Sequence, residues 1–437
     1  MIEEGLKKFK DKKFLQALNI FNELNKSNPN NGDILFFLGN IYYELNDLKK
    51  SLFYLEKSLK KFPNSQIIIN NYAITLQSLG KFGEAKRLFQ NLIKLNPKNI
   101  KAYYRLFSMN LEDFDKKYLN EIKSLEVKSS LVDRGLINFI CSKYEKTKNI
   151  KNEIKYLNLA HEYQFKSRLE YNTKLTEYHT KIISNNYNKF DFLDNDKKFN
   201  SLEDKQPIFI IGLPRSGSTL IESLLTQNNK NCYSYGESSI FDFSIFNQVK
   251  KNILNKEYDY KNFNIFFIKE ILIDSIENIY SYSNDNFIID KSLENFFYVD
   301  LILKIFPKAK FIHTFRDRID SAIAIYQSML IYLPWSHSID NISKYILNYE
   351  KIINYFKDKY PDKILDVKLE DFTSNPKSLS KKIFRFCDFD IPKNMLEFYS
   401  NKNLVSKTSS FFQIHKKIQM YEKDKYKPYY FLIKNKF

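Results

Sequence analysis

The chain has 437 residues, of which 43% are hydrophobic and 16% aromatic, and its formal net charge is +18. This length allows two domains with separate cores, and the composition excludes an intrinsically disordered chain. Lysines are scattered along the sequence without an arginine-rich stripe, which favours a solvated surface over a nucleic-acid interface, although a basic cleft would attract an anionic cofactor or an acidic acceptor.

The first hundred residues repeat themselves. Pro29, Pro63 and Pro97 recur every 34 residues, which is the tetratricopeptide period. The same interval relates small residues where two helices approach and large apolar residues behind them, namely Ala17, Ser51 and Ala85, and Phe21, Leu55 and Phe89. Residues 1–100 therefore resemble tetratricopeptide repeats, which predicts an α-helical solenoid with a concave surface.

Residues 101–185 keep a helical pattern while the period decays, and 137–163 are typical of one further, degenerate repeat. We expect a helical domain over 1–200, with the polar stretch 185–206 as the boundary. The concave surface of such an array is a possible docking groove for a protein partner, and a packing or dimerisation element is the alternative use.

A phosphate-binding loop follows at 207–219, PIFIIGLPRSGST. Residues 208–211 predict a buried strand and 220–227 a helix. Gly212, Gly217, Ser218 and Thr219 fall on the positions of G-x-x-x-x-G-K-[ST], with Ser218 in place of the lysine. Such a loop can cradle a 5′-phosphate, but it lacks the lysine with which nucleoside triphosphatases reach the terminal phosphates.

Three more apolar segments predict strands at 287–290, 310–315 and 363–369, separated by helical patterns. This alternation favours a P-loop-like, three-layer α/β domain over 205–437, with a mostly parallel sheet and ligands at the carboxyl ends of its strands. Lys291 and Arg316 directly follow two of these strands, so they are candidates for binding an anion.

Cysteine usage and the N-terminus favour a reducing compartment. Cys141, Cys232 and Cys387 lie far apart without a C-x-x-C pair, so neither a disulfide framework nor a metal site is expected. The N-terminus lacks the apolar core of a signal peptide, and there is no run of about 18 uncharged apolar residues. We therefore expect a cytoplasmic protein without a membrane partner.

The phosphate loop, AKFIHTFRDRIDSAIAIYQ and KILDVKLEDFTSNP together resemble the sulfotransferase family. The resemblance covers about 206–427, and the repeats in front of it match bacterial members with tetratricopeptide repeats, which are related to protein-tyrosine sulfotransferases. It implies 3′-phosphoadenosine 5′-phosphosulfate as the sulfuryl donor, without a metal. In that family the first segment binds the 5′-phosphosulfate and the second the 3′-phosphate.

The resemblance also implies which residues hold the donor. The expected donor-binding residues come from the loop, the second segment and the late stretch 405–418: Pro214, Arg215, Ser216, Gly217, Ser218, Thr219, Arg316, Ser321, Lys407, Ser409 and Lys416. Two positions depart from the family pattern. Ala324 replaces a serine that contacts the 3′-phosphate, with Ser321 as a nearby substitute, and Leu369 replaces a tyrosine.

The expected catalytic residues are Glu237, Lys291 and Arg215. Glu237 follows Gly236 as the catalytic base does in the protein-tyrosine enzymes, and Lys291 matches a lysine near the bridging oxygen of the donor. A structural carboxylate and a solvated lysine are the alternatives. The expected acceptor is a hydroxyl of a peptide tyrosine, a glycan or a metabolite, with the tyrosine favoured by Glu237 and the repeats.

Two other functions remain open on the residues alone. One is a nucleotide kinase that would need Mg²⁺ and a replacement lysine such as Lys291. The other is a repeat adaptor with a degenerate transferase domain, which Ala324 and Leu369 favour and the intact loop disfavours.

Overall fold

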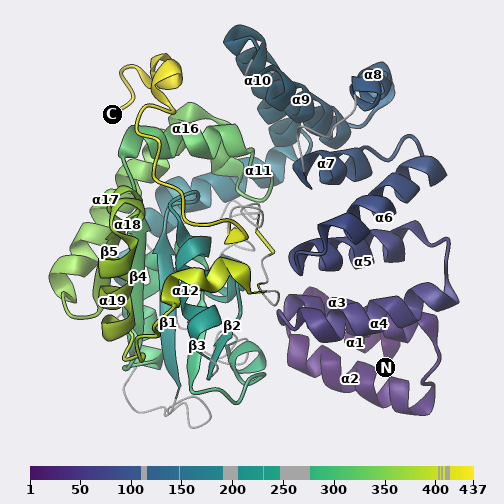
Figure 1. Ribbon diagram of the computed structural model, residues 1–437, viewed down its shortest axis with the longest axis horizontal. Coiled ribbons are helices and arrows are strands. Elements are labelled where there is room, and N and C mark those ends of the chain that lie inside the picture. Colours follow the sequence, from purple (N-terminus) through teal and green to yellow (C-terminus); the bar gives the residue numbers. More distant parts are fainter. Residues whose placement is uncertain are drawn as a thin grey trace.

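The computed structural model describes residues 1–109, 116–146, 148–189, 205–229, 231–246, 276–401, 404, 407–408 and 414–437. Stacked helices form the N-terminal half, and a sheet covered by helices forms the C-terminal half (Figure 1). This arrangement confirms the predicted fold class of a helical repeat region followed by an α/β domain with a parallel sheet. The expected boundary falls largely on 190–204, which lie outside the described residues.

The repeat helices form consecutive hairpins: α1 (Ile2–Lys10), α2 (Phe14–Ser27), α3 (Gly32–Glu44), α4 (Leu48–Lys61), α5 (Gln66–Ser78) and α6 (Phe82–Leu95). The small residues at the predicted crossings, Ala17, Ser51 and Ala85, are fully buried. Their burial confirms the 34-residue period as a packing rule, because a larger side chain there would push the paired helices apart.

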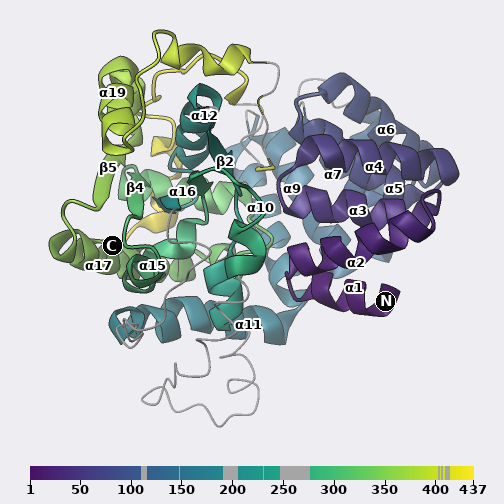
Figure 2. The ribbon, with the colours of Figure 1, turned by 90° about the horizontal axis from the view of Figure 1, so that it is seen from below.

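Further helices continue the array: α7 (Ile100–Met109), α8 (Lys116–Leu125), α9 (Leu131–Glu145), α10 (Ile150–Lys166) and α11 (Leu169–Glu177). The degenerate repeat expected at 137–163 corresponds to the α9–α10 hairpin. A π-helical turn at Tyr178–Ile182 and two 3₁₀ turns at Ile183–Asn185 and Tyr187–Lys189 follow α11. Figures 1 and 2 show α11 leading from the repeats to the half that contains the sheet.

The sheet has the order β2-β3-β1-β4-β5, and all its neighbouring strands are parallel. Its strands are β1 (Gln206–Gly212), β2 (Cys232–Ser234), β3 (Phe287–Asp290), β4 (Lys310–Phe315) and β5 (Ile364–Lys368). Four of them were predicted from apolar runs. The edge strand β2 was missed because it is three residues long and only partly buried.

Alternate residues of the central strands enter two different cores, as the two-residue period of a strand requires. Phe209, Ile211 and Phe311 belong to a large cluster on one face. Ile210 and Ile312 belong to a smaller cluster on the other face. Figure 2 shows α12 and α19 on one side of the strands and α15 and α17 on the other, so both faces are covered.

The covering α-helices are α12 (Ser218–Asn228), α15 (Val299–Ile305), α16 (Arg318–Ser328), α17 (Ile339–Lys359), α18 (Leu369–Ser374) and α19 (Pro376–Phe386). Short 3₁₀ segments connect or follow them: η5 (Leu293–Tyr298), η6 (Pro334–His337), η7 (Met395–Ser400) and η8 (Lys427–Ile433). Figure 1 shows the sheet and its covering helices beside the repeat array.

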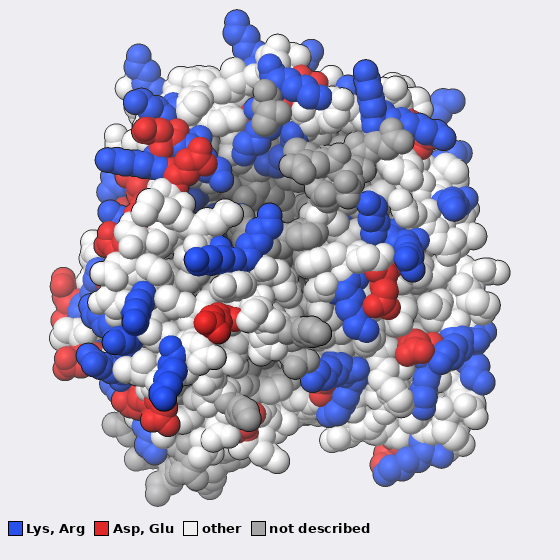
Figure 3. All heavy atoms as spheres, in the orientation of Figure 1, with Lys and Arg blue, Asp and Glu red and all other residues white. Residues whose placement is uncertain are grey.

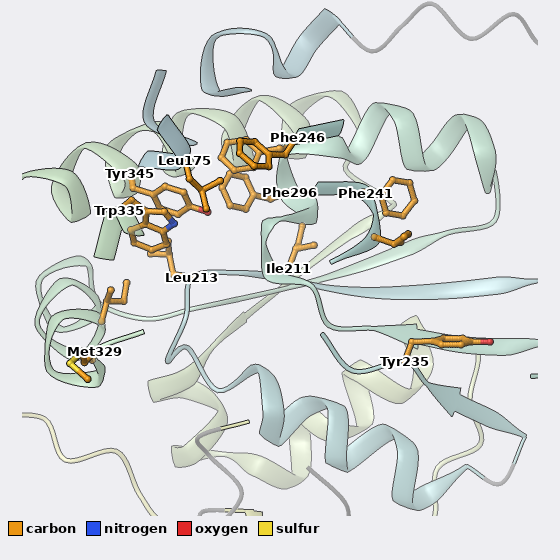
Figure 4. Packing of buried hydrophobic residues seen from close by; sticks show 14 of the residues in the cluster. Leu175, Ile211, Leu213, Tyr235, Phe241, Phe246, Phe296, Met329, Trp335 and Tyr345 are labelled. Carbon is orange, nitrogen blue, oxygen red and sulfur yellow. The ribbon is translucent and has the colours of Figure 1, made fainter. Parts of the chain in front are cut away.

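The two halves of the protein share one core. Figure 4 shows Leu175 of α11 beside Tyr345 and Trp335 of the C-terminal half. At another point His161 Nδ1 lies 2.9 Å from His337 Nδ1, and His161 Nε2 lies 2.8 Å from the carbonyl oxygen of Tyr326. Burial lowers the pKa of both imidazoles, to about 3 for His161 and about 4 for His337, so the contact is uncharged at neutral pH.

Among the described residues, no helix has both the length and the apolar character needed to cross a membrane.

Candidate active site

The phosphate loop is held in shape by backbone conformations that suit glycine. Gly212 has φ +142° and Gly217 has φ +90°. A Cβ atom on Gly212 would lie 2.1 Å from the carbonyl oxygen of Thr314, where β1 passes β4. At Gly212 the backbone of the neighbouring strand, and not a ligand, therefore excludes a side chain.

Gly217 ends the loop as the N-cap of α12, whose first N–H groups have no partner within the helix. Backbone N–H groups at a helix N-terminus, together with the helix dipole, favour an anion. Arg215 adopts φ +69° within the loop. Leu369, which stands where the family has an aromatic residue, packs over the loop, because a Cβ on Gly217 would lie 2.7 Å from its Cδ1.

The loop hydroxyls have different roles. Ser216 Oγ donates to the carbonyl oxygen of Leu213 at 2.7 Å and lies 2.8 Å from Thr314 Oγ1, so it braces the loop. Thr219 Oγ1 lies 3.2 Å from Thr408 Oγ1, which connects α12 to the late C-terminal segment. Ser218 is buried in the first turn of α12.

A second group of candidate anion-binding residues lies at the end of β4. Arg316 is 8% exposed, and its Nη2 donates to the carbonyl oxygen of Asp320 at 2.9 Å. Its Nε is buried without a hydrogen-bond partner among the described residues, and so is the hydroxyl of Ser321. Buried polar groups in a folded protein nearly always have partners, so these two donors fit a phosphate that would bind here.

The C-terminal segment covers this arrangement. The Arg316 guanidinium lies 5.0 Å from the ring centroid of Tyr426, and Tyr421 donates a hydrogen bond to Asp320. Burial lowers the pKa of Arg215, and the positive charge of Arg316 lowers it further. The charges of Arg215 and Arg316 therefore interact with each other. Two arginines placed in this way suit an elongated ligand with two anionic groups.

Ala324 is only 3% exposed and lies in the packed interior of α16. It supplies no hydroxyl, which leaves Ser321, one helical turn earlier, as the available donor on this helix. The expected hydroxyl is therefore absent at Ala324, and the Ser321 hydroxyl, which has no partner among the described residues, is a candidate replacement.

Glu237 and Lys291 meet at the edge of the sheet. Lys291 Nζ lies 2.6 Å from Glu237 Oε1, and 3.8 Å from Glu222 Oε2 on α12. The Lys291 side chain is fully buried, whereas that of Glu237 is 53% exposed. The Lys291 ammonium group is thus enclosed by the protein, whereas the Glu237 carboxylate is accessible from solvent.

Burial by itself would lower the pKa of Lys291, but the carboxylates of Glu237 and Glu222 outweigh it and raise the pKa. Lys291 therefore keeps its positive charge at neutral pH and cannot serve as a base. Glu222 was not singled out by the sequence, although its position one turn after Ser218 on the loop helix was a usable signal.

The late segment contributes one of its three predicted residues to this region. Lys407 Nζ donates to the carbonyl oxygen of Tyr43 at 3.0 Å, and the charges of Glu237 and Glu222 act on its pKa, which burial lowers. Lys416 is exposed. Ser409 lies outside the described residues.

Two lysines of the repeat half, Lys143 and Lys146, lie near the site, and no sequence motif predicted them. Burial lowers the pKa of Lys143 on α9 to about 7, with a further contribution from the positive charges of Lys146 and Arg215. Lys146 Nζ donates to Gln327 Oε1 at 3.2 Å. Figure 3 shows Lys and Arg side chains around a hollow between the two halves. The arrangement favours an anionic ligand at the junction.

Comparison with known proteins agrees with this geometry. Residues 207–393 match the family model for the sulfotransferase family, and residues 8–69 and 68–99 match models for the tetratricopeptide repeat. An uncharacterized protein of Aquifex aeolicus (strain VF5) is 26% identical over 394 residues, which cover 86% of this chain and 50% of that relative. The chain thus spans about half the length of this relative.

Two solved structures are similar over part of the chain. The sulfotransferase domain from the Synechococcus PCC 7002 olefin synthase has 20% identity and a TM-score of 0.39, and the match covers 52% of this chain and 88% of that domain. Sulfotransferase STF1 from Mycobacterium tuberculosis H37Rv has 10% identity and a TM-score of 0.32, with 68% and 97% covered.

The family model ends before the C-terminal segment that covers Arg316, and it begins at the strand that leads into the phosphate loop. It therefore contains the loop, Glu237, Lys291 and Arg316. Residues 207–393 are therefore similar to the sulfotransferase family, and tetratricopeptide repeats precede them.

Proposed function

We propose that the protein is a sulfotransferase that moves a sulfuryl group from 3′-phosphoadenosine 5′-phosphosulfate to an acceptor hydroxyl, with a peptide tyrosine as the favoured acceptor. The contact of 2.6 Å between Lys291 and Glu237 carries the proposal, because it joins a buried cation and an accessible carboxylate beside a phosphate loop. The match of residues 207–393 to the sulfotransferase family supports the same reaction class.

The residues fit this donor at two points. The N-terminus of α12 and Arg215 would hold the 5′-phosphosulfate, and Arg316 with Ser321 would hold the 3′-phosphate. The donor supplies an activated sulfuryl group on a phosphate leaving group. Sulfuryl transfer resembles phosphoryl transfer in depending on positioning and on neutralisation of charge at the leaving oxygens. That the reaction needs no metal stays a prediction.

The proposed roles of the catalytic pair follow from their positions. Glu237 takes the proton of the acceptor hydroxyl while the acceptor oxygen forms its bond to sulfur. The bond between sulfur and the bridging oxygen of the donor breaks, and Lys291 stabilises the negative charge that develops on that oxygen. Because the pKa of Lys291 is raised, this stabilisation persists through neutral pH.

The repeats offer a place for a protein partner. A pocket of about 580 Å³ lies between α3 and α5, and Phe36, Phe37 and Phe62 line it together with Ile67 and Lys61. Phe62 and Ile67 are 41% and 60% exposed. Aromatic side chains suit an apolar peptide segment, and Lys61 and Asp33 add one charge of each sign to the lining, so we propose that a protein acceptor docks here.

The test is transfer of label from the donor to peptides, glycans and metabolites of an extract, with mass spectrometry to locate the modified hydroxyl. We expect Glu237→Gln to lower turnover by about 100-fold or more, in line with the loss of a general base, while donor binding is retained. Glu84→Gln, which alters an exposed carboxylate on α6, is the matched control. Wild-type turnover in Glu237→Gln would reject its role as the base.

Titration calorimetry separates this function from a kinase. We expect the protein to bind 3′-phosphoadenosine 5′-phosphate more tightly than ATP with Mg²⁺, because Lys291 is committed to Glu237 and no lysine stands in the loop. Preference for ATP with Mg²⁺ would overturn the proposal. Donor binding without transfer to any acceptor pool would favour the adaptor.

A further inference from the structure

The turn between the two helices of each clear repeat contains one residue in the left-handed conformation. These residues are Lys12, Asn46 and Gly80, with φ +56°, +66° and +74°. They recur every 34 residues and therefore occupy the same repeat position. In each turn the N–H of the following residue bonds a carbonyl five residues earlier, as in the Schellman motif that ends many helices.

All three turns face the transferase domain. Lys12 Nζ donates to the carbonyl oxygen of Ser238 at 3.1 Å. Asn46 Nδ2 donates to the carbonyl oxygen of Ser234 at 2.8 Å. Gly80 lies against the His415 ring so closely that a Cβ would be 2.8 Å from its Cε1. The edge of the solenoid formed by these turns is thus an interface inside the molecule.

The first two contacts lie on either side of Glu237 in the sequence. Ser234 ends β2, and Ser238 directly follows Glu237. The backbone between them has two further supports from the sheet side. The N–H of Tyr235 donates to the carbonyl oxygen of Ile289 at 2.9 Å, and the N–H of Lys291 donates to that of Gly236 at 2.8 Å. The segment 234–238 is therefore held by the sheet on one side and by the repeats on the other.

The position of β2 explains why it needs this support. It is an edge strand of three residues, and β3 is its neighbour in the sheet order. An edge strand leaves one row of backbone groups without ladder partners. The second repeat makes two contacts with β2. The Tyr233 hydroxyl of β2 donates to the carbonyl oxygen of Leu45 at 2.7 Å, and the Asn46 side-chain amide of the repeat donates to the carbonyl oxygen of Ser234.

We propose that the left-handed turns of the repeats form a clamp that positions the segment 234–238, with Lys12 and Asn46 as positioning residues for Glu237. The proposal rests on the proposed function, because it takes Glu237 as the base. The repeat array then has a part in catalysis in addition to any docking on its pocket. The third turn, at Gly80, supports the late segment, since His415 follows Lys407 in the chain.

Asn46→Gly is the decisive variant. Glycine adopts the left-handed turn without cost, so the substitution removes the amide while keeping the fold of the repeat. We expect the turnover number to fall by about tenfold or more, with unchanged affinity for 3′-phosphoadenosine 5′-phosphate, because small displacements of a catalytic group lower rates steeply. Asn435→Gly is the matched control, as Asn435 also has φ +67° but is exposed near the C-terminus.

A double-mutant cycle distinguishes positioning from a general structural effect. If Asn46 acts through Glu237, Asn46→Gly should cause no further loss in the Glu237→Gln background. Lys12→Met should behave in the same way, since it retains the stem of the side chain and removes the donor to Ser238. Wild-type turnover in Asn46→Gly, or a loss of equal size in both backgrounds, would overturn the clamp.

Amide hydrogen exchange tests the clamp without any assay of transfer. We expect Asn46→Gly, and not Asn435→Gly, to speed exchange in the segment 234–238, because its support on the free edge is weakened. If the wild-type protein transfers no sulfuryl group while this exchange result holds, the proposed function fails and the clamp stands as a structural device. Unchanged exchange in Asn46→Gly would reject the clamp whatever the enzyme does.

Discussion

The two glycines of the phosphate loop, Gly212 and Gly217, are required for different physical reasons. Gly212 is required by the carbonyl oxygen of Thr314, which would lie 2.1 Å from a Cβ atom. Gly217 is required by its left-handed φ of +90° and by Leu369 above it. One glycine therefore permits close packing of two strands, and the other shapes the helix N-terminus that would receive the donor.

Gly212→Ala should lower the free energy of unfolding by about 3 kcal/mol, because a backbone clash and a left-handed alanine act together. Gly83→Ala is the control, since a Cβ on Gly83 has no atom within 4 Å. That control should be neutral or slightly stabilising. Urea unfolding of both variants measures the difference, and equal stability would contradict this account of Gly212.

Ser321→Ala should weaken binding of 3′-phosphoadenosine 5′-phosphate by about tenfold, because a hydrogen bond to a charged group contributes about 1.5–3 kcal/mol. The folded protein should lose little stability, since the Ser321 hydroxyl has no partner among the described residues. Calorimetry with adenosine 5′-phosphate, which lacks the 3′-phosphate, should show no difference between variant and wild type. An equal loss for both nucleotides would place Ser321 elsewhere in the site.

At the scale of elements, α9 brings positive charge from the repeat half to the junction. Lys143 donates to the carbonyl oxygen of Gln327 at the end of α16, and Lys146 donates to the side chain of the same residue. Glu153 on α10 opposes these charges, and Tyr429 donates to its Oε2 at 2.5 Å. Helices from both halves therefore determine the electrostatic field around Arg215.

Donor affinity should fall as pH rises through neutrality. Burial lowers the pKa of Lys143 to about 7, so its charge is present below this pH and is lost above it. An anionic ligand favours the charged form, and its binding should therefore take up protons near pH 7 to 8. Lys143→Gln should bind the nucleotide more weakly at pH 6.5 and show a flatter pH profile. Calorimetry in buffers of different ionisation enthalpy measures the uptake, and an unchanged profile in the variant would contradict this role.

At the scale of the whole molecule, the halves are joined by contacts that an independent docking arm would lack. A single apolar cluster contains residues of the repeats, such as Phe21, and residues of the sheet, such as Phe209. Tyr178 and Tyr298 share a buried hydrogen bond of 2.8 Å, and His161 and His337 form another across the same junction. The repeat array therefore shares its hydrophobic core with the domain that contains the sheet.

Thermal unfolding should consequently show one cooperative transition for the full chain. Residues 205–437 expressed alone should expose part of the shared cluster and unfold at a lower temperature or aggregate. Scanning calorimetry of the full chain and of the fragment makes the comparison. Two well-separated transitions, with the fragment retaining the stability of its half, would show that the halves fold independently.

The sequence by itself determined most of the elements and which residues end the strands. The 34-residue period fixed the repeats, because each repeat must bury the same face against its neighbour. Apolar runs fixed β1, β3, β4 and β5, and the residues that end them, including Lys291 and Arg316, could be selected because strand ends in parallel sheets meet at one edge. The roles of Lys291 and Arg316 stay predictions, and both residues lie within the range 207–393 that matches the sulfotransferase family.

Only the tertiary structure decided which distant groups meet. The structure favours Ser321 as the replacement for the serine that is absent at Ala324, because the Ser321 hydroxyl is buried without a partner among the described residues. Lys143 and Asn46 had no signal in the sequence, since their importance comes from contacts with residues about 180 or more positions away. The periodicity of a sequence indicates which face of a helix or strand is buried, but it does not indicate which other element packs against that face. The packing of the two halves determines this, and it brings Lys12 and Asn46 of the repeats into contact with the residues around Glu237.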